Sequence, residues 1–150
     1  MSAIWERSHA LEVNVDAAFA WAFMTDVGNW FDPPAEFSLD GPFVDGAVGT
    51  TRVDGQVVIA WRVRDLTPGS SYTIEFVLDG AAVRCVWSFT PLGESRCRLA
   101  QRIVLSGDNA GAFVDNVAAG FGMNLESGLA KVARAIEDRE AIHRQSSSTN

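Results

Sequence analysis

The stretch SYTIEFVLDGAAVRCVWSFT, residues 71–90, decides the fold of this chain. Apolar and polar residues alternate on both sides of Asp79-Gly80, and such a dipeptide between alternating segments is a strong hairpin signal. A tight turn there places three pairs opposite one another on one face: Phe76 with Val83, Ile74 with Cys85, and Tyr72 with Trp87. Glu75 then lies across from Arg84 on the other face. The stretch therefore predicts an antiparallel hairpin with one apolar face.

Further turn signals lie outward from this hairpin, at Asp54-Gly55, Pro68-Gly69 and Leu92-Gly93-Glu94, and they predict a meander of strands. Continuing the register adds more residues to the apolar face: Val57, Ile59, Trp61, Val63, Phe89, Cys97, Leu99, Gln101, Ile103 and Leu105. The opposite face carries a charged row of Arg62, Glu75, Arg84 and Arg102. We interpret that row as the solvated side of the sheet, where opposite charges pair across strands.

The N-terminal third predicts one strand followed by short helices. Alternation over residues 4–15 places His9 on the apolar face of a half-buried strand. Either Asn14 or Asp16 can cap a short helix that runs to Met24. Residues 25–46 are rich in glycine and proline, which permits only a short helical turn and a short edge strand.

The C-terminal third changes to a helical period, with apolar residues at Val117, Phe121, Leu125, Val132 and Ile136. We expect one long helix from Gly111 to Glu140, with Gly128 in close contact with the sheet. Residues 144–150 have nothing apolar to bury and are expected to form a disordered polar tail. The predicted organisation is one domain over residues 1–143.

Composition excludes several classes of function. The formal net charge of -7 disfavours a nucleic-acid partner. The charged N-terminus and the lack of a long apolar segment indicate no membrane insertion and a cytoplasmic location. Cys85 and Cys97 are too few for a metal site or disulfide framework, so we interpret both as small buried hydrophobes and expect no metal and no cofactor.

Several motifs together resemble a known fold. They are Phe19-Ala20-Trp21 with Thr25-Asp26 and Trp30, the hairpin strands 87–91 and 95–102, and residues 125–129 of the helix. In this order they resemble the helix-grip fold of START domains, the birch-pollen allergen family and, most closely, the polyketide cyclase/dehydratase-like proteins. The resemblance implies an α+β fold: a curved antiparallel sheet of about six to seven strands, two short N-terminal helices and one long C-terminal helix. It also implies a cavity for a hydrophobic molecule, without implying one chemistry.

The leading hypothesis is therefore binding of a small hydrophobic molecule between sheet and helix. The residues expected to contact it are Trp30, Trp61, Tyr72, Phe76, Cys85, Trp87, Gln101, Val117, Phe121 and Asn124. Gln101 is predicted to be buried, where an unpaired amide costs roughly 1 to 3 kcal/mol. Gln101, Asn124 and His9 either anchor the ligand or bond to backbone and buried water, and for His9 we favour the second reading.

Two alternatives stay open. A cyclase or dehydratase acting on an aromatic or polyketide-type substrate would use His9 or Asp26 to move the proton. No strong catalytic motif supports that alternative, and carboxylates in loops are usually solvated. An interaction module with a filled core would instead carry an exposed apolar patch. The sequence makes no prediction of oligomeric state.

Overall fold

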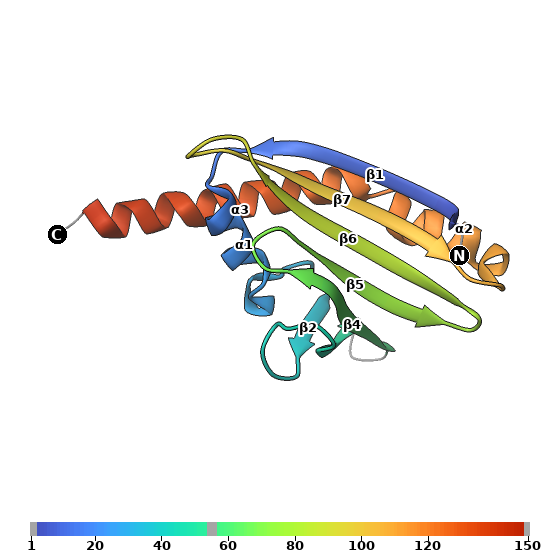
Figure 1. Ribbon diagram of the computed structural model, residues 1–150. Coiled ribbons are helices and arrows are strands. Elements are labelled where there is room, and N and C mark those ends of the chain that lie inside the picture. Colours follow the sequence, from blue (N-terminus) through green and yellow to red (C-terminus); the bar gives the residue numbers. More distant parts are fainter. Residues whose placement is uncertain (1–2, 54–56, 149–150) are drawn as a thin grey trace.

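The computed structural model describes residues 3–53 and 57–148 (Figure 1). Its strands are β1 (Ala3–Val13), β2 (Ala35–Leu39), β3 (Val48–Val53), β4 (Val57–Thr67), β5 (Ser71–Leu78), β6 (Ala81–Pro91) and β7 (Cys97–Ser106). Its helical segments are α1 (Ala17–Met24), η1 (Val27–Asn29), η2 (Ala110–Phe113), α2 (Val114–Val117), η3 (Ala118–Gly122) and α3 (Leu125–Ser148). The predicted turn at Asp54-Gly55 lies outside the described residues.

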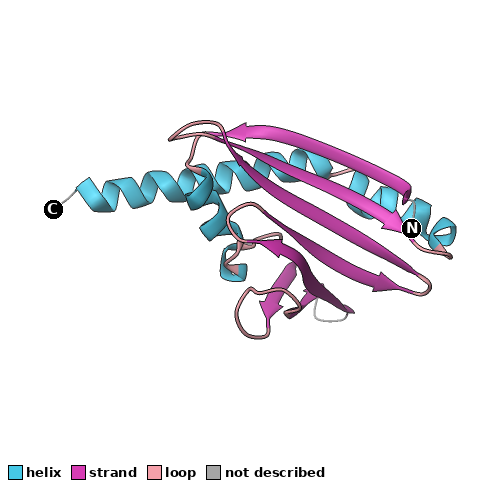
Figure 2. Cartoon of the chain, in the orientation of Figure 1, coloured by secondary structure: helices cyan, strands magenta, loops and turns pink. Residues whose placement is uncertain are grey.

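The strands form one antiparallel seven-stranded sheet in the order β1-β7-β6-β5-β4-β3-β2. The hairpin register predicted around Asp79-Gly80 is confirmed, because Phe76 lies opposite Val83 and Tyr72 opposite Trp87. The N-terminal strand returns to the far edge and pairs with β7, next to the last strand of the meander. The helices cover one face of the sheet (Figure 2), so the α+β helix-grip prediction is confirmed.

The N-terminal helical segments follow from local capping. Asp16 is the N-cap of α1, and its carboxylate accepts a hydrogen bond from Ala18 N at 3.1 Å. Such caps satisfy a backbone donor that the first turn leaves free. The second short helix is only a 3₁₀ turn, η1, which Asp26 caps in the same way. One of the two expected N-terminal helices is therefore a single turn.

The expectation of one unbroken helix from Gly111 to Glu140 is wrong. The segment begins with η2 and α2, widens into the π-helical turn η3, and starts again as α3 at Leu125. Met123 N donates to Ala118 O at 3.0 Å, five residues back, as a π turn requires. Gly122 faces the sheet here, where an added Cβ would lie 2.9 Å from Trp5 Cζ2. The widened turn thus coincides with a close contact between helix and sheet.

The predicted polar tail also needs correction, because α3 continues to Ser148 and so includes residues 144–148. An ion pair joins Arg144 to Glu140 one turn earlier. Such i,i+4 pairs stabilise a helix locally, and one residue earlier the His143 ring lies 6.1 Å from that of Phe19 on α1. In Figure 1 this end of α3 extends past the sheet.

The outer face of the sheet carries paired charges, as predicted, but Glu75 at its centre is buried at 9% exposure and not solvated. Glu75 accepts from Arg84 Nε at 2.9 Å and lies 3.4 Å from Arg64 Nε. Arg102 forms a two-pronged pair with Glu6 at 2.7 and 3.0 Å. Within residues 3–53 and 57–148, no helix is long and apolar enough to cross a membrane.

Candidate ligand-binding site

One flank of α3 is tied to the edge strand β1, the strand with which α3 makes its main contact. Arg7 lies on the inward side of β1 and pairs with Glu126 of the helix at 3.4 Å. Further along, Asn14 N donates to the Glu137 carboxylate at 2.8 Å. The apolar stripe between sheet and helix is closed, with Leu129 only 1% exposed. On this side the helix and the sheet leave no room for another molecule.

The opposite flank of the helical region consists of Phe121 of η3 with Gly128 and Val132 of α3, and we call it the open flank. At 3.6 residues per turn, Gly128 and Glu126 project to opposite sides of the helix. All three open-flank residues are half-buried, and the Phe121 ring lies 5.4 Å from the ring of Phe76 on β5. A Cβ built on Gly128 would meet no neighbouring atom within 4 Å. The expected close packing of Gly128 is therefore wrong, because the tight contact falls at Gly122.

Four inward-facing residues lie side by side across the sheet at one level. Tyr72 pairs with Trp87, Trp87 with Gln101, and Gln101 with His9. We call these four residues the inner row. Tyr72 is fully buried, whereas Trp87, Gln101 and His9 are half-buried. The next level, at Ile74, Cys85 and Ile103, is closed. On β6 and β7 the inner row is thus more accessible than this next level, and further along β5 the inward residues Phe76 and Leu78 are again half-buried.

Gln101 faces inward as the register predicts, but it is half-buried and not fully buried. Among the described residues, no hydrogen bond or ion pair involves the side chains of Gln101 or His9. The amide therefore avoids the cost of an unpaired buried group only by reaching open space. Both side chains remain able to bond to something outside the chain.

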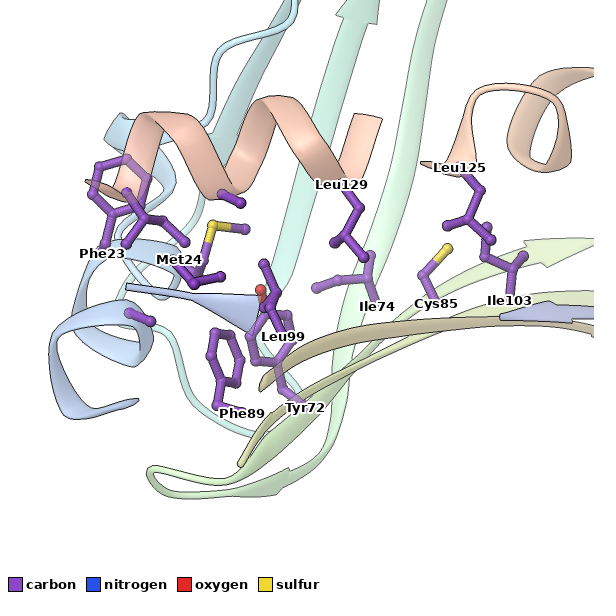
Figure 3. Packing of buried hydrophobic residues seen from close by; sticks show 14 of the residues in the cluster. Phe23, Met24, Tyr72, Ile74, Cys85, Phe89, Leu99, Ile103, Leu125 and Leu129 are labelled. Carbon is purple, nitrogen blue, oxygen red and sulfur yellow. The ribbon is translucent and has the colours of Figure 1, made fainter. Parts of the chain in front are cut away.

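Tyr72 is the centre of an aromatic cluster. Its ring lies 5.8 Å from Trp21, 5.0 Å from Phe43 and 6.3 Å from Trp87. Figure 3 shows the Tyr72 ring projecting from the sheet toward the helices α1 and α3. The Tyr72 hydroxyl is buried without a hydrogen-bond partner among the described residues, and burial raises its pKa. A buried hydroxyl without a hydrogen-bond partner is unfavourable, so an acceptor placed beside it would stabilise the structure.

Trp30 and Trp61 form a second cluster toward the β2 edge, with ring centroids 5.2 Å apart. The indole N–H of Trp30 donates to Met24 O at 2.8 Å, and that of Trp61 donates to Thr51 Oγ1 at 3.0 Å. Their polar atoms are already satisfied by the chain. The cluster also uses Phe43, which lies 6.3 Å from Trp30. Phe43 comes from a Gly/Pro-rich loop that carries no periodic signal, so the sequence did not indicate it.

The remaining predicted contacts divide between buried and exposed positions. Val117 and Cys85 are buried at 4% exposure each, and desolvation raises the pKa of the Cys85 thiol to about 12. Asn124 is exposed, which contradicts its placement on the inward stripe. Asn124 lies in the turn between η3 and α3, directly before the buried Leu125. Of the predicted contacts, the structure thus places Tyr72, Trp87 and Gln101 side by side in the inner row, and it brings Phe76 and Phe121 together as a separate ring pair.

The two candidate catalytic residues lie apart. Asp26 is exposed, accepts from Gly28 N at 3.0 Å, and lines a hollow of about 430 Å³ beside β2. Its segment η1 contacts β2, at the opposite edge of the sheet from β1 and His9. They form no acid–base pair with each other. Within the described part of the chain, no group of His, Cys, Asp or Glu side chains is placed to hold a metal ion.

A curved antiparallel sheet with a helix across its concave face defines the helix-grip class. The profile of the family described as polyketide cyclase / dehydrase and lipid transport matches residues 6–137, and the chain belongs to this family. No functionally curated protein matches the chain significantly.

Several solved structures share the fold. A norcoclaurine synthase mutant from Thalictrum flavum, in complex with a transition-state analogue, is 17% identical with a TM-score of 0.71, covering 96% of this chain and 99% of its own. A Nitrosomonas europaea protein, NE0264, is 13% identical with a TM-score of 0.71 and covers 94% and 99%. The Zhui aromatase/cyclase from a Streptomyces species is 19% identical with a TM-score of 0.66 and covers 90% and 94%. At these identities the likeness shows the fold alone.

Proposed function

We propose that this protein binds a small hydrophobic molecule between the open flank of α3 and the inner row of the sheet. The ligand would lie against the rings of Phe76, Trp87 and Phe121, beneath the unfilled position at Gly128. Apolar walls with a few unpaired polar groups are typical of small-molecule sites. The family description, which names polyketide cyclases and lipid transport, agrees with a ligand of this kind.

The observation that carries the proposal is the contrast between two glycines of the C-terminal helical region, Gly122 in η3 and Gly128 in α3. A Cβ at Gly122 would strike Trp5, so that glycine is explained by close packing. Gly128 faces open space although it is half-buried, and an interior helical glycine costs about 0.5 to 1 kcal/mol relative to alanine. The missing side chain leaves space that a ligand would occupy, which explains why glycine is present at this position despite its cost.

The test fills the proposed space. Gly128→Trp places an indole beside Phe121, and Ala130→Trp places the same group on the exposed side of α3 as a matched control. The probe is phenylnaphthylamine, an uncharged fluorophore, with energy transfer from tryptophan as the readout. We expect the wild type and Ala130→Trp to bind it alike and Gly128→Trp to lose binding while its melting temperature stays nearly unchanged.

Two results would contradict the proposal. A folded wild-type protein that leaves a panel of apolar probes unbound would remove the binding function. A Gly128→Trp variant that keeps full probe affinity would show that the ligand lies elsewhere.

A cyclase or dehydratase activity is the second candidate, and the position of His9 favours it. His9 faces inward beside Gln101 and has no partner among the described residues, so it could exchange a proton with a ligand in the inner row. The assay is formation of cyclised or dehydrated product from a linear poly-β-ketone thioester, followed by mass spectrometry. We expect His9→Asn to abolish turnover but keep probe binding. Wild-type turnover no faster than in buffer would rule the activity out.

A further inference from the structure

The inward positions of the three central strands carry no charge. On β5 they are Tyr72, Ile74, Phe76 and Leu78; on β6 and β7, all of whose residues the structure describes, the corresponding positions are likewise uncharged. The charged side chain closest in register is Arg7 on β1, and it already pairs with Glu126. A carboxylate bound against these strands would lose its hydration without gaining a cation. The surface therefore disfavours anions.

The same surface offers unpaired hydrogen-bond donors. Tyr72 and Gln101 flank Trp87, and since adjacent strands lie about 4.8 Å apart, their backbones are about 10 Å apart. The Gln101 amide is half-buried and can reach a ligand directly. The Tyr72 hydroxyl stays protonated because burial raises its pKa, so it can donate to an acceptor. The half-buried ring of Trp87 provides a flat platform between the two donors.

The Tyr72 hydroxyl has no exposed surface in this conformation. Four rings surround the Tyr72 ring, namely Phe43 at 5.0 Å, Trp21 at 5.8 Å, Phe89 at 6.0 Å and Trp87 at 6.3 Å, and of these Trp87 is the one that belongs to the inner row. A ligand that shifts the half-buried Trp87 ring would supply the acceptor that the free protein lacks. The hydrogen bond gained would then satisfy a group that is unpaired before binding.

We infer that the site selects an uncharged aromatic ligand bearing a hydrogen-bond acceptor, such as a ketone, over the carboxylate of the same shape, with Gln101 and Tyr72 as the residues that make this distinction. The inference rests on the proposed function and names the ligand chemistry of the same site.

Three naphthalenes of matched shape test it at neutral pH: methyl naphthyl ketone, isopropenylnaphthalene and naphthoate. Their affinities are measured by titration calorimetry or by quenching of tryptophan fluorescence. We expect the ketone to bind about five- to tenfold more tightly than the hydrocarbon, the yield of one hydrogen bond, and naphthoate to bind most weakly.

The variants are Tyr72→Phe, Gln101→Leu and the double variant, with Thr90→Val on the exposed outer side of β6 as the control. We expect each single variant to reduce the preference for the ketone over the hydrocarbon, and the double variant to bind the two alike. Thr90→Val should keep the wild-type preference. If the double variant does not fold, Gln101→Leu alone decides, since its half-buried position tolerates an apolar side chain.

Naphthoate binding as tightly as the ketone, or a preference that survives in both single variants, would overturn the inference while leaving the binding function intact. Failure of all three compounds to bind the folded wild type would instead contradict the proposed function itself.

Discussion

The two flanks of α3 meet opposite surroundings on the same sheet. Toward β1 the helix is fastened by the Arg7–Glu126 pair and by the bond from Asn14 to Glu137. On the open flank, a Cβ added at Gly128 would meet no atom within 4 Å. One helix can thus be fixed to the sheet along one side and leave a surface available along the other. If the two flanks differ in energy as they do in geometry, substitutions on them should have unequal effects.

The largest effect is expected from truncating the closed stripe. Leu129→Ala removes a side chain that is 1% exposed and should cost about 2 to 5 kcal/mol of unfolding free energy. Phe121→Ala on the open flank removes more atoms, but the ring is only half-buried, so the loss should be smaller. Denaturant unfolding of both variants measures the difference. Equal losses would mean that both flanks are packed alike.

Alanine at the two glycines should change stability in opposite directions. Gly122→Ala brings a Cβ to 2.9 Å from the rigid ring of Trp5 and should destabilise by about 1 to 3 kcal/mol. Gly128→Ala meets nothing and should stabilise the helix by about 0.5 to 1 kcal/mol. Gly120→Ala, also facing open space, is the control for helix propensity. Melting temperatures that shift the same way at Gly122 and Gly128 would refute the contrast.

The burial of Cys85, in the closed level next to the inner row, should make the free energy of unfolding depend on pH in the alkaline range. The ordinary thiol pKa is 9.0, and burial raises that of Cys85 to about 12. Between these values the unfolded chain has lost the proton and the folded protein has kept it. Stability is therefore full below about pH 9 and falls as pH rises, by about 1.4 kcal/mol per pH unit. Cys85→Val should reduce this slope in urea unfolding series, with little change at neutral pH, and should leave the part that Tyr72 and Cys97 contribute, because burial raises their pKa values too. An unchanged slope would indicate that water already reaches the thiol.

The smallest effect is expected from the outer face, where the Arg102–Glu6 pair is fully exposed. The hydrogen bonds from Arg102 lower the pKa of Glu6 below its ordinary 4.5. The stabilisation is thus present above that value and lost as pH falls through the lowered pKa. Glu6→Gln should lower the melting temperature slightly at neutral pH, and the difference should vanish in acid and in high salt. A difference that persists in acid would point to another cause.

Much of the fold followed from the sequence because its signals are local. Alternation and the Asp79-Gly80 turn predicted the register that places Tyr72, Trp87 and Gln101 on one face. Side-chain direction in a strand has a strict period of two, so one well-placed turn settles every neighbouring position. The cap at Asp16 was readable for the same reason, since donor and acceptor lie within a few residues.

Tertiary structure decided the features on which the site depends. The π turn at Ala118–Gly122 brings Gly122 against Trp5, a residue distant in sequence. Helical periodicity therefore could not reveal that Gly122 packs tightly and Gly128 does not. It also could not reveal that Asn124 is exposed. The sequence by itself determined which residues face the concave side of the sheet. Only packing determined where α3 rests on that side, because a helix position is set by long-range contacts of its buried residues, such as Leu125, Leu129 and Ile136, that no local pattern encodes.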